Sequence, residues 1–252
     1  MPVITVVLVS QPLGLLLVFL AALAAGGDVP PQGPMAAAIG GGAAGCFGLA
    51  CFFAAMARGP MSIVAPIASL GAVVPVAVGL ARGEDPAAIQ VAGLVLALAG
   101  IAMAVREAEQ PHAADVPSRS VVLAALAGLG FGTFFVGLDA AGAHDALWAA
   151  AGGRIGGSAA VVLAALALRP ALGLHRSALP ALVAIAVLDT VANVLFAAAS
   201  SEGLLSLVAV AGSLYPVTTI LLARFVLGER LVRVQQVGVA LALGGVAMIA
   251  AG

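Results

Sequence analysis

The sequence predicts an all-α integral membrane protein in which nine transmembrane helices form two inverted repeats. Three observations carry this prediction. First, 63% of the 252 residues are hydrophobic and 8% are charged, whereas a soluble domain is about half apolar and a quarter charged. Second, the apolar residues gather in nine continuous runs. Third, the second half of the chain repeats the first.

The nine runs approach the length that a membrane span requires. A helix needs about 20 apolar residues to cross the hydrocarbon core. The runs cover 3–25, 35–56, 61–81, 87–105, 120–141, 146–168, 181–200, 204–226 and 231–251. They are continuously apolar rather than alternating, which argues against the strands of a transmembrane barrel.

The repeat is visible where two pairs of segments are aligned. "GPMSIVAPIASL" (59–70) matches "GLLSLVAVAGSL" (203–214), and "GEDPAAIQVAGLVLALAGIAM" (83–103) matches "GERLVRVQQVGVALALGGVAM" (228–248). Glycine and polar residues recur together with the apolar ones, which chance in an apolar chain explains poorly. The chain therefore contains an internal duplication.

The two copies differ in length. Residues 1–105 form a first repeat of four spans, 106–119 a charged linker, and 120–252 a second repeat of five spans. The segment that opens the second copy (121–142) has no counterpart before Met1, so the first copy is expected to lack its first helix. An odd number of spans per repeat unit makes the two copies face opposite ways, as in many secondary transporters.

Arginine placement predicts the orientation, because cytoplasmic loops carry an excess of basic residues. The loops on one side hold Arg58, Arg106, Arg119, Arg169, Arg176, Arg230 and Arg233. The loops on the other side hold only Arg82. This bias places Met1 and the linker in the cytoplasm and Gly252 outside.

Three motifs near the end of the second copy carry a resemblance to a known family. They are Ser213, Leu214 and Pro216; the Leu-Gly-Glu-Arg turn at 227–230; and Gln235 with Gly238. The first copy keeps Ser69 and Leu70, Gly83 and Glu84, and Gln90 and Gly93. With its paired helical units, the chain resembles the EamA-type branch of the drug/metabolite transporter superfamily. The resemblance implies ten spans, cytoplasmic termini and a central cavity between the halves; this chain departs in its missing first span and in its arginine bias.

Arg154 is the first candidate site residue, because an ionisable side chain inside a span is costly and suggests a function. It stands in "WAAAGGRIGGSAAVV" (148–162), a run that is otherwise small and apolar. Two interpretations are open: the guanidinium lines a cavity, or the long side chain snorkels to the interface or is held in a structural pair.

Asp189 is the natural partner of Arg154, because it is almost central in the following span and too short to snorkel. It is expected to be paired, protonated, or exposed to a water-filled cavity. A functional role is favoured, and the alternative is a structural ion pair or hydrogen bond with Arg154. Asn193 lies four residues on and shares its face, while Thr190 is expected to bond its own helix backbone. In the first copy Arg154 aligns with Gln11 and Asp189 with Cys46. A central site would be polar mainly on the side that the second copy contributes, which suits an anionic or zwitterionic solute better than a symmetric hydrophobic pore would.

The positions of other residues in the spans suggest further roles. Tyr215, the only tyrosine, is a candidate to hydrogen-bond a substrate, with ordinary packing as the alternative. Trp148 is expected to be an interfacial anchor. Prolines are expected to interrupt the third and eighth spans, at Pro66, Pro75 and Pro216. Glycine pairs four apart are expected to pack helices within the chain: Gly41/Gly45, Gly128/Gly132, Gly152/Gly156 and Gly153/Gly157.

The sequence favours transport over other function classes. It contains no enzyme motif, no cofactor or metal motif, and no nucleotide-binding domain. A net charge of −1 without a basic cluster argues against nucleic acid. We therefore expect a multi-pass protein of the plasma membrane that exports a small metabolite or drug by alternating access. The alternative is a transport-incompetent scaffold or a subunit of a hetero-complex; a homo-oligomer is also left open.

Overall fold

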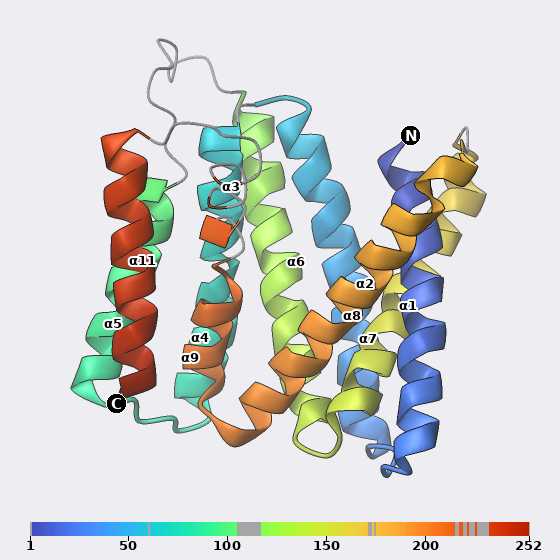
Figure 1. Ribbon diagram of the computed structural model, residues 1–252, viewed down its shortest axis with the longest axis horizontal. Helices are drawn as coiled ribbons and strands as arrows, with labels where there is room; N and C mark the ends of the chain where they lie inside the picture. The colour runs from blue at the N-terminus through green and yellow to red at the C-terminus, as the bar shows by residue number, and fades with distance from the viewer. Residues whose placement is uncertain are drawn as a thin grey trace. The chain divides into compact units, whose positions relative to one another are not determined.

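The computed structural model describes residues 2–59, 61–104, 117–170, 173, 175–214, 217–218, 221, 225 and 232–251. Every regular element in these ranges is helical, and none is a strand. The elements are α1 (Val3–Ala25), α2 (Gln32–Met56), α3 (Met61–Ser69), η1 (Leu70–Ala72), α4 (Val73–Ala81), α5 (Ala88–Ala104), α6 (Ser118–Gly142), α7 (Ala146–Leu168), η3 (Arg176–Ala178), α8 (Leu179–Glu202), α9 (Leu205–Gly212) and α11 (Arg233–Ala251) (Figure 1).

The expected all-α membrane protein is confirmed. Seven helical segments in the described part of the chain are long and apolar enough to cross a membrane. An eighth, α5, is apolar but has 17 residues. The expected span 204–226 is described only in part: it begins with α9, and positions 215–216, 219–220, 222–224 and 226 lie outside the described residues. Helices satisfy all their backbone hydrogen bonds internally, which is why continuously apolar runs adopt this form in a bilayer. The count of nine spans therefore stays a prediction.

The chain forms two compact units. The first consists of Met1–Phe47 and Thr133–Gly203, and the second of Gly48–Gly132 and Leu204–Gly252. Each unit takes segments from both predicted repeats, and the boundaries fall within α2 and α6. The repeat boundaries at 1–105 and 120–252 describe sequence duplication rather than packing, so they remain predictions.

Glycines bring the helices of the first unit into close contact. Gly42 lies against the backbone of Gly153, and Gly156 lies against the backbone of Ile39, so a Cβ on either glycine would collide with main-chain atoms. Gly41 lies against Gly137 less tightly, since a Cβ on Gly41 would lie 3.2 Å from Gly137 Cα. The expectation that the paired glycines pack helices within the chain is confirmed for these positions, because small residues let helix backbones approach.

Trp148 joins two loops of the first unit. Asp145 caps α7 by accepting a hydrogen bond from the Trp148 backbone N–H at 2.8 Å. The indole Nε1 donates to the carbonyl of Gly27 at 3.0 Å, and the ring packs edge-on against Phe19. Trp148 is buried, so its assignment as an interfacial anchor was wrong: the indole N–H is satisfied by protein rather than by the membrane interface.

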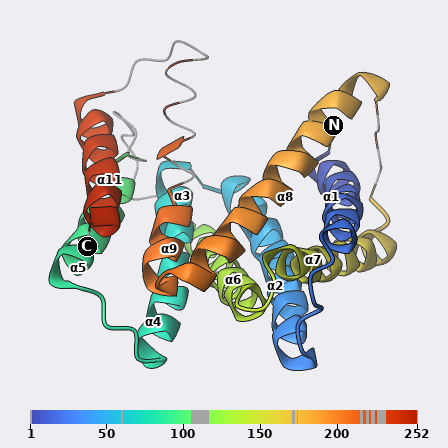
Figure 2. The ribbon, with the colours of Figure 1, turned by 60° about the horizontal axis from the view of Figure 1, so that its bottom comes forward.

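In the second unit α5 and α11 lie side by side and run in opposite directions (Figure 1, Figure 2). Gly93 lies against the backbone of Gly245. Gly100 in turn lies against Ala242 and Gly238. Contacts that pair an early residue of one helix with a late residue of the other establish the antiparallel arrangement.

The third span is interrupted next to Pro75, as predicted, but not at Pro66, which lies within α3. The 3₁₀ turn η1 separates α3 from α4, and Pro75 stands in the first turn of α4, where its missing N–H leaves no helical bond unmade. Pro216 lies outside the described residues. After α4, Glu84 caps α9: its carboxylate accepts from the backbone N–H groups of Leu205 at 2.7 Å and Ser206 at 3.1 Å. One carboxylate thus ties the end of α4 to the start of α9.

Candidate functional site

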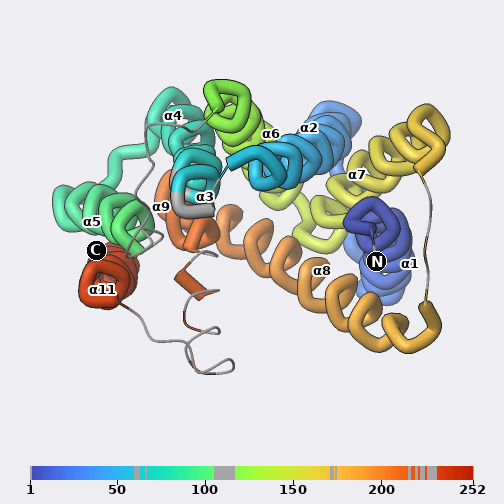
Figure 3. Tube along the Cα trace, turned by 90° about the horizontal axis from the view of Figure 1, so that it is seen from above, coloured from blue at the N-terminus to red at the C-terminus, as the bar shows by residue number. Residues whose placement is uncertain are grey.

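Four of the five predicted site residues lie in the first unit. Gln11 is on α1, Arg154 on α7, and Asp189 and Asn193 on α8. Both α7 and α8 pack against α1 (Figure 3). The fifth, Tyr215, lies outside the described residues.

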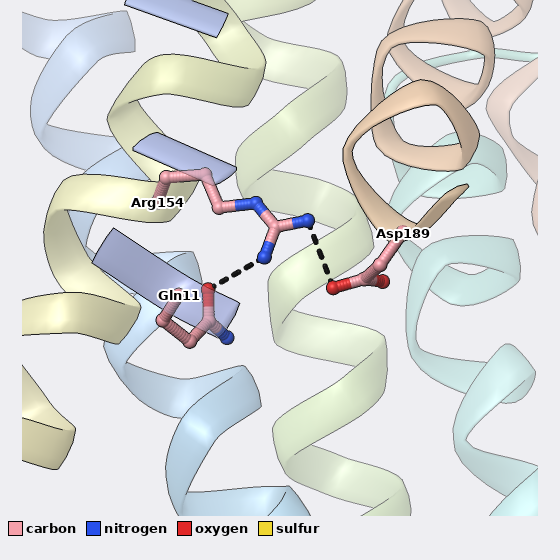
Figure 4. Close-up of polar contacts among 3 residues, drawn as sticks. All are labelled: Gln11, Arg154 and Asp189. Carbon is pink, nitrogen blue, oxygen red and sulfur yellow. Dashed lines mark hydrogen bonds and ion pairs between the residues drawn. The ribbon is translucent and has the colours of Figure 1, made fainter. Parts of the chain in front are cut away.

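Arg154 is buried and joins the other two helices. Its side chain is 2% exposed. Nη1 donates to Gln11 Oε1 at 2.8 Å, and Nη2 lies 2.8 Å from Asp189 Oδ2 in an ion pair (Figure 4). The predicted partnership with Asp189 is therefore confirmed. Snorkelling is wrong for this residue, because the guanidinium turns toward α1 and α8 and is shielded from the surroundings.

The two charges differ in environment. The Asp189 side chain is 53% exposed, against 2% for Arg154. A charged residue at the centre of a span costs about 2.5–3.5 kcal/mol on the insertion scale, and an opposite charge offsets part of that cost. The buried member depends on the pair more than the exposed member does.

Two glycines make room for the polar side chains. Gly14 follows Gln11 by three positions and Gly157 follows Arg154 by three, so each glycine shares a helix face with its polar residue. A Cβ on Gly14 would lie 3.1 Å from Arg154 Cζ and 3.2 Å from Nε. A Cβ on Gly157 would lie 3.2 Å from Gln11 Nε2. Each polar side chain thus lies on the glycine of the opposite helix.

Thr190 belongs to the site, although sequence reasoning assigned it another role. It is 7% exposed, and its hydroxyl has no hydrogen-bond partner among the described residues. The same point above Gly14 lies 2.7 Å from Thr190 Oγ1. The expected bond to its own helix backbone is absent, because the hydroxyl turns toward α1 and Arg154. The one feature of the sequence that could have pointed to Thr190 is its position next to Asp189.

Asn193 is one turn beyond Asp189 on α8 and is half-buried. Within the described part of the chain, no hydrogen bond connects it with Arg154 or Gln11. No group of three or more His, Cys, Asp or Glu side chains there is arranged to hold a metal ion. The geometry thus centres on a buried guanidinium, an amide, a hydroxyl and a half-exposed carboxylate.

Long apolar helices around a buried ion pair define a multi-pass, α-helical membrane protein. Residues 118–251 match the model of the EamA-like transporter family. This match covers more than half of the chain, and the protein belongs to that family. The resemblance predicted from the sequence motifs is therefore confirmed.

Comparison with solved structures supports the fold. One solved crystal structure of a protein shares 21% sequence identity with this chain at a TM-score of 0.84. The alignment covers 99% of this chain and 89% of the other. Among curated proteins the chain has no match.

The family motifs now have structural roles. Gln90 Oε1 accepts from the backbone N–H of Ala87 at 2.8 Å, and Gln235 Oε1 accepts from that of Val232 at 3.1 Å. In both copies the glutamine reaches back to cap the start of its helix, in the manner of a capping box. The glycine three positions later lies in the contact between α5 and α11. The remaining motif, 227–230, lies outside the described residues.

Proposed function

We propose that the protein is a secondary transporter that exports small metabolites or drugs by alternating access between two inverted repeats. Membership of the EamA-like transporter family supports transport of a small solute across a bilayer. Within the multi-pass class, we place the protein in the plasma membrane.

The observation that carries the proposal is a set of reciprocal contacts between the repeats. The sequence alignment pairs Gly93 with Gly238 and Gly100 with Gly245. In the structure Gly93 contacts Gly245 and Gly100 contacts Gly238. Such an exchange of partners is what a local two-fold axis produces, and an axis relating antiparallel helices supports inverted repeats.

The residues of the candidate site show the same exchange of contact partners between aligned positions. The alignment pairs Gln11 with Arg154 and Gly14 with Gly157. Arg154 lies over Gly14, Gln11 lies against Gly157, and Gln11 and Arg154 bond to each other. The polar residues therefore meet where the two repeats meet, which is where transporters built on inverted repeats bind their solutes.

We assign roles to the site residues on this basis. Arg154 binds or neutralises a negative group of the solute, and Gln11 holds the guanidinium in place. Asp189 sets the charge of the site or relays a proton. Asn193 hydrogen-bonds to the solute, and Tyr215 is kept as a further candidate for that role.

Flux through reconstituted vesicles tests the proposal. The purified protein is reconstituted into lipid vesicles, and the vesicles are loaded with a broad panel of metabolites and drugs. Efflux of each solute is measured with and without a pH gradient. We expect protein-dependent efflux of at least one solute, and at least a tenfold loss in Arg154→Gln. Gly244→Ala is the control, because a Cβ there meets only Leu96 Cδ2 at 4.0 Å.

Two results would count against parts of the proposal. If no solute moves faster than in protein-free vesicles, the protein is a scaffold or requires a partner subunit. If Asp189→Asn keeps the wild-type response to the pH gradient, Asp189 does not relay the proton.

A further inference from the structure

The turn that ends α4 directs a carboxylate back over its own helix. The backbone N–H of Glu84 donates to the carbonyl of Gly79 at 3.1 Å, and that of Gly83 donates to the carbonyl of Leu80 at 3.0 Å. Gly83 has a φ of 90°, so the chain reverses through a left-handed glycine at the helix end. A Cβ on Gly79 would collide with the Glu84 carboxylate. Gly83 therefore sets the direction of Glu84, and Gly79 leaves room for its side chain.

The start of α9 needs hydrogen-bond acceptors that its own sequence does not supply. The first backbone N–H groups of a helix have no acceptor inside that helix. The third and fourth N–H groups of α9 donate to the carbonyl of Leu204 at 3.1 Å, but Leu204 has no side-chain group that could cap the others. Glu84 accepts from the first two, those of Leu205 and Ser206. The first turn of α9 thus depends on a residue that follows α4.

Breaking this contact requires that water enter between the two helices. Hydrogen bonds to an ionised carboxylate are about twice as strong as neutral ones, and the helix dipole favours an anion at the start of α9. Leu205 is 2% and Ser206 0% exposed, whereas Glu84 is half-buried. If the carboxylate leaves, the two buried N–H groups need water as their acceptor. Water can reach them only where α4 and α9 separate, so release of Glu84 and separation of these helix ends are coupled.

The contact also joins the two predicted repeats. Glu84 and α4 belong to the first repeat and α9 to the second, and the two helices pack against each other. In alternating access the repeats move against one another, so that each end of the pathway opens in turn. A contact between the repeats at one end of the spans therefore has to break when that end opens.

We propose that Glu84 is the latch of a gate between α4 and α9. Its carboxylate holds the end of α4 on the start of α9 while this end of the pathway is closed, and it leaves α9 when this end opens. The inference rests on the proposed function and adds a residue that controls access to the pathway. Glu84 acts through α9 and does not touch the solute, so it is a positioning residue. With the predicted orientation, the loop that carries it faces outward, and the latch closes the outer end.

Hydrogen exchange of the full chain in lipid nanodiscs tests whether Glu84 holds α9. Glu84→Ala should raise the exchange rates of the Leu205 and Ser206 amides by about tenfold or more, because both lose a charged acceptor. Gly79→Ala should have the same effect although the carboxylate remains, because the added methyl group displaces it from its position. The second variant keeps the charge, so a matching result traces the exchange to the contact itself.

Two controls match these variants. Asp85→Ala removes the neighbouring carboxylate, which is exposed. Gly244→Ala places a methyl group on a helical glycine that has open space beside it. Neither should change the exchange of the first turn of α9.

A reversible cross-link tests whether the latch has to open during transport. Asp85 and Leu204 each adjoin a residue of the contact, and neither is buried. Asp85→Cys and Leu204→Cys are combined in a chain in which Cys46 and Cys51 are replaced by alanine. Bis-methanethiosulfonate reagents of graded length join the two new thiols, and the mass of the protein confirms the link. Efflux of the solute panel from vesicles should fall about tenfold or more on linking and recover on reduction. Each single-cysteine chain, treated with the same reagents, is the control and should keep its efflux.

The outcomes separate the inference from the proposed function. Unchanged amide exchange in both Glu84→Ala and Gly79→Ala overturns the latch, whether or not solutes move. Equal efflux before and after reduction of the cross-link shows a cap that never opens, which overturns the gate while transport stands. Absence of efflux in the wild-type protein overturns the proposed function and the gate with it.

Discussion

The helix pairs α1/α7 and α5/α11 share one pattern, in which residues that are aligned in the sequence exchange contacts between the two helices. They differ in the side chains at these contacts. In α5/α11 the contact residues are glycine and alanine, such as Gly100 against Ala242, and the backbones touch. In α1/α7 the corresponding contacts carry Gln11 and Arg154, each lying on a glycine of the other helix. One pair is sealed by apolar packing and the other encloses hydrogen-bond donors.

The difference shows what a charge requires inside an apolar bundle. At the glycines of α5 and α11 the two backbones lie so close that there is no room for a larger side chain, and no polar side chain lies at these contacts. In α1/α7 the glycine at every polar contact supplies the volume that a guanidinium or amide occupies. The stability of the pair α5/α11 (the packing pair) should therefore depend on side-chain volume. That of the pair α1/α7 (the polar pair) should depend on charge.

The largest effect is expected in the polar pair. Asp189→Asn leaves the buried Arg154 charge without its counter-ion, which should lower the free energy of unfolding by about 3 kcal/mol. Arg154→Gln leaves behind a half-exposed carboxylate and should cost less. Denaturant titration in detergent micelles, read by circular dichroism, measures both.

The double variant provides the control. Arg154→Gln combined with Asp189→Asn keeps no unpaired charge, so its stability should return to within about 1 kcal/mol of the wild type. A double variant as unstable as the sum of the singles would show that the loss reflects shape rather than charge.

A smaller effect is expected in the packing pair. A Cβ on Gly245 would lie 2.5 Å from Ala97 N and from the Gly93 carbonyl oxygen, so Gly245→Ala forces α5 and α11 apart. Overpacking of this kind costs about 1–3 kcal/mol. The same titration measures it, with Gly244→Ala as the comparison on the neighbouring residue.

The two alanine variants should differ in sign. Gly244 has open space beside it, so alanine there should raise stability by about 0.5 kcal/mol through its higher helix propensity. Equal effects at the two positions would contradict the tight contact between α5 and α11.

Much of this comparison was predictable from the sequence. The apolar runs predicted the helices, because a bilayer admits few other solutions. The alignment of Arg154 with Gln11 predicted which residues correspond, and charge predicted that Arg154 would find Asp189. These are properties of composition and spacing, which a single sequence displays directly.

The rest depended on distances that spacing does not contain. Thr190 could equally have bonded its own helix, and only packing against Gly14 turned its hydroxyl toward Arg154. Tryptophan is a typical residue of the membrane interface, yet Trp148 is buried and its indole N–H donates to the loop carbonyl of Gly27. The contact of Gln11 with Arg154 required knowing that corresponding helices lie against each other.

The smallest effect tests whether the two predicted repeats are equivalent at a pair of aligned residues that carry no charge and make no tight packing contact. Gln90 and Gln235 are corresponding residues that cap corresponding helices through the same reach-back hydrogen bond. Gln90→Ala and Gln235→Ala should each lower the free energy of unfolding by about 0.5 kcal/mol. The two caps lie at opposite ends of the antiparallel pair, on the order of 25 Å apart at the helical rise, so the double variant should show the sum. Unequal losses, or a double variant that departs from the sum by more than about 0.5 kcal/mol, would show that the repeats have diverged in energetics as well as in charge.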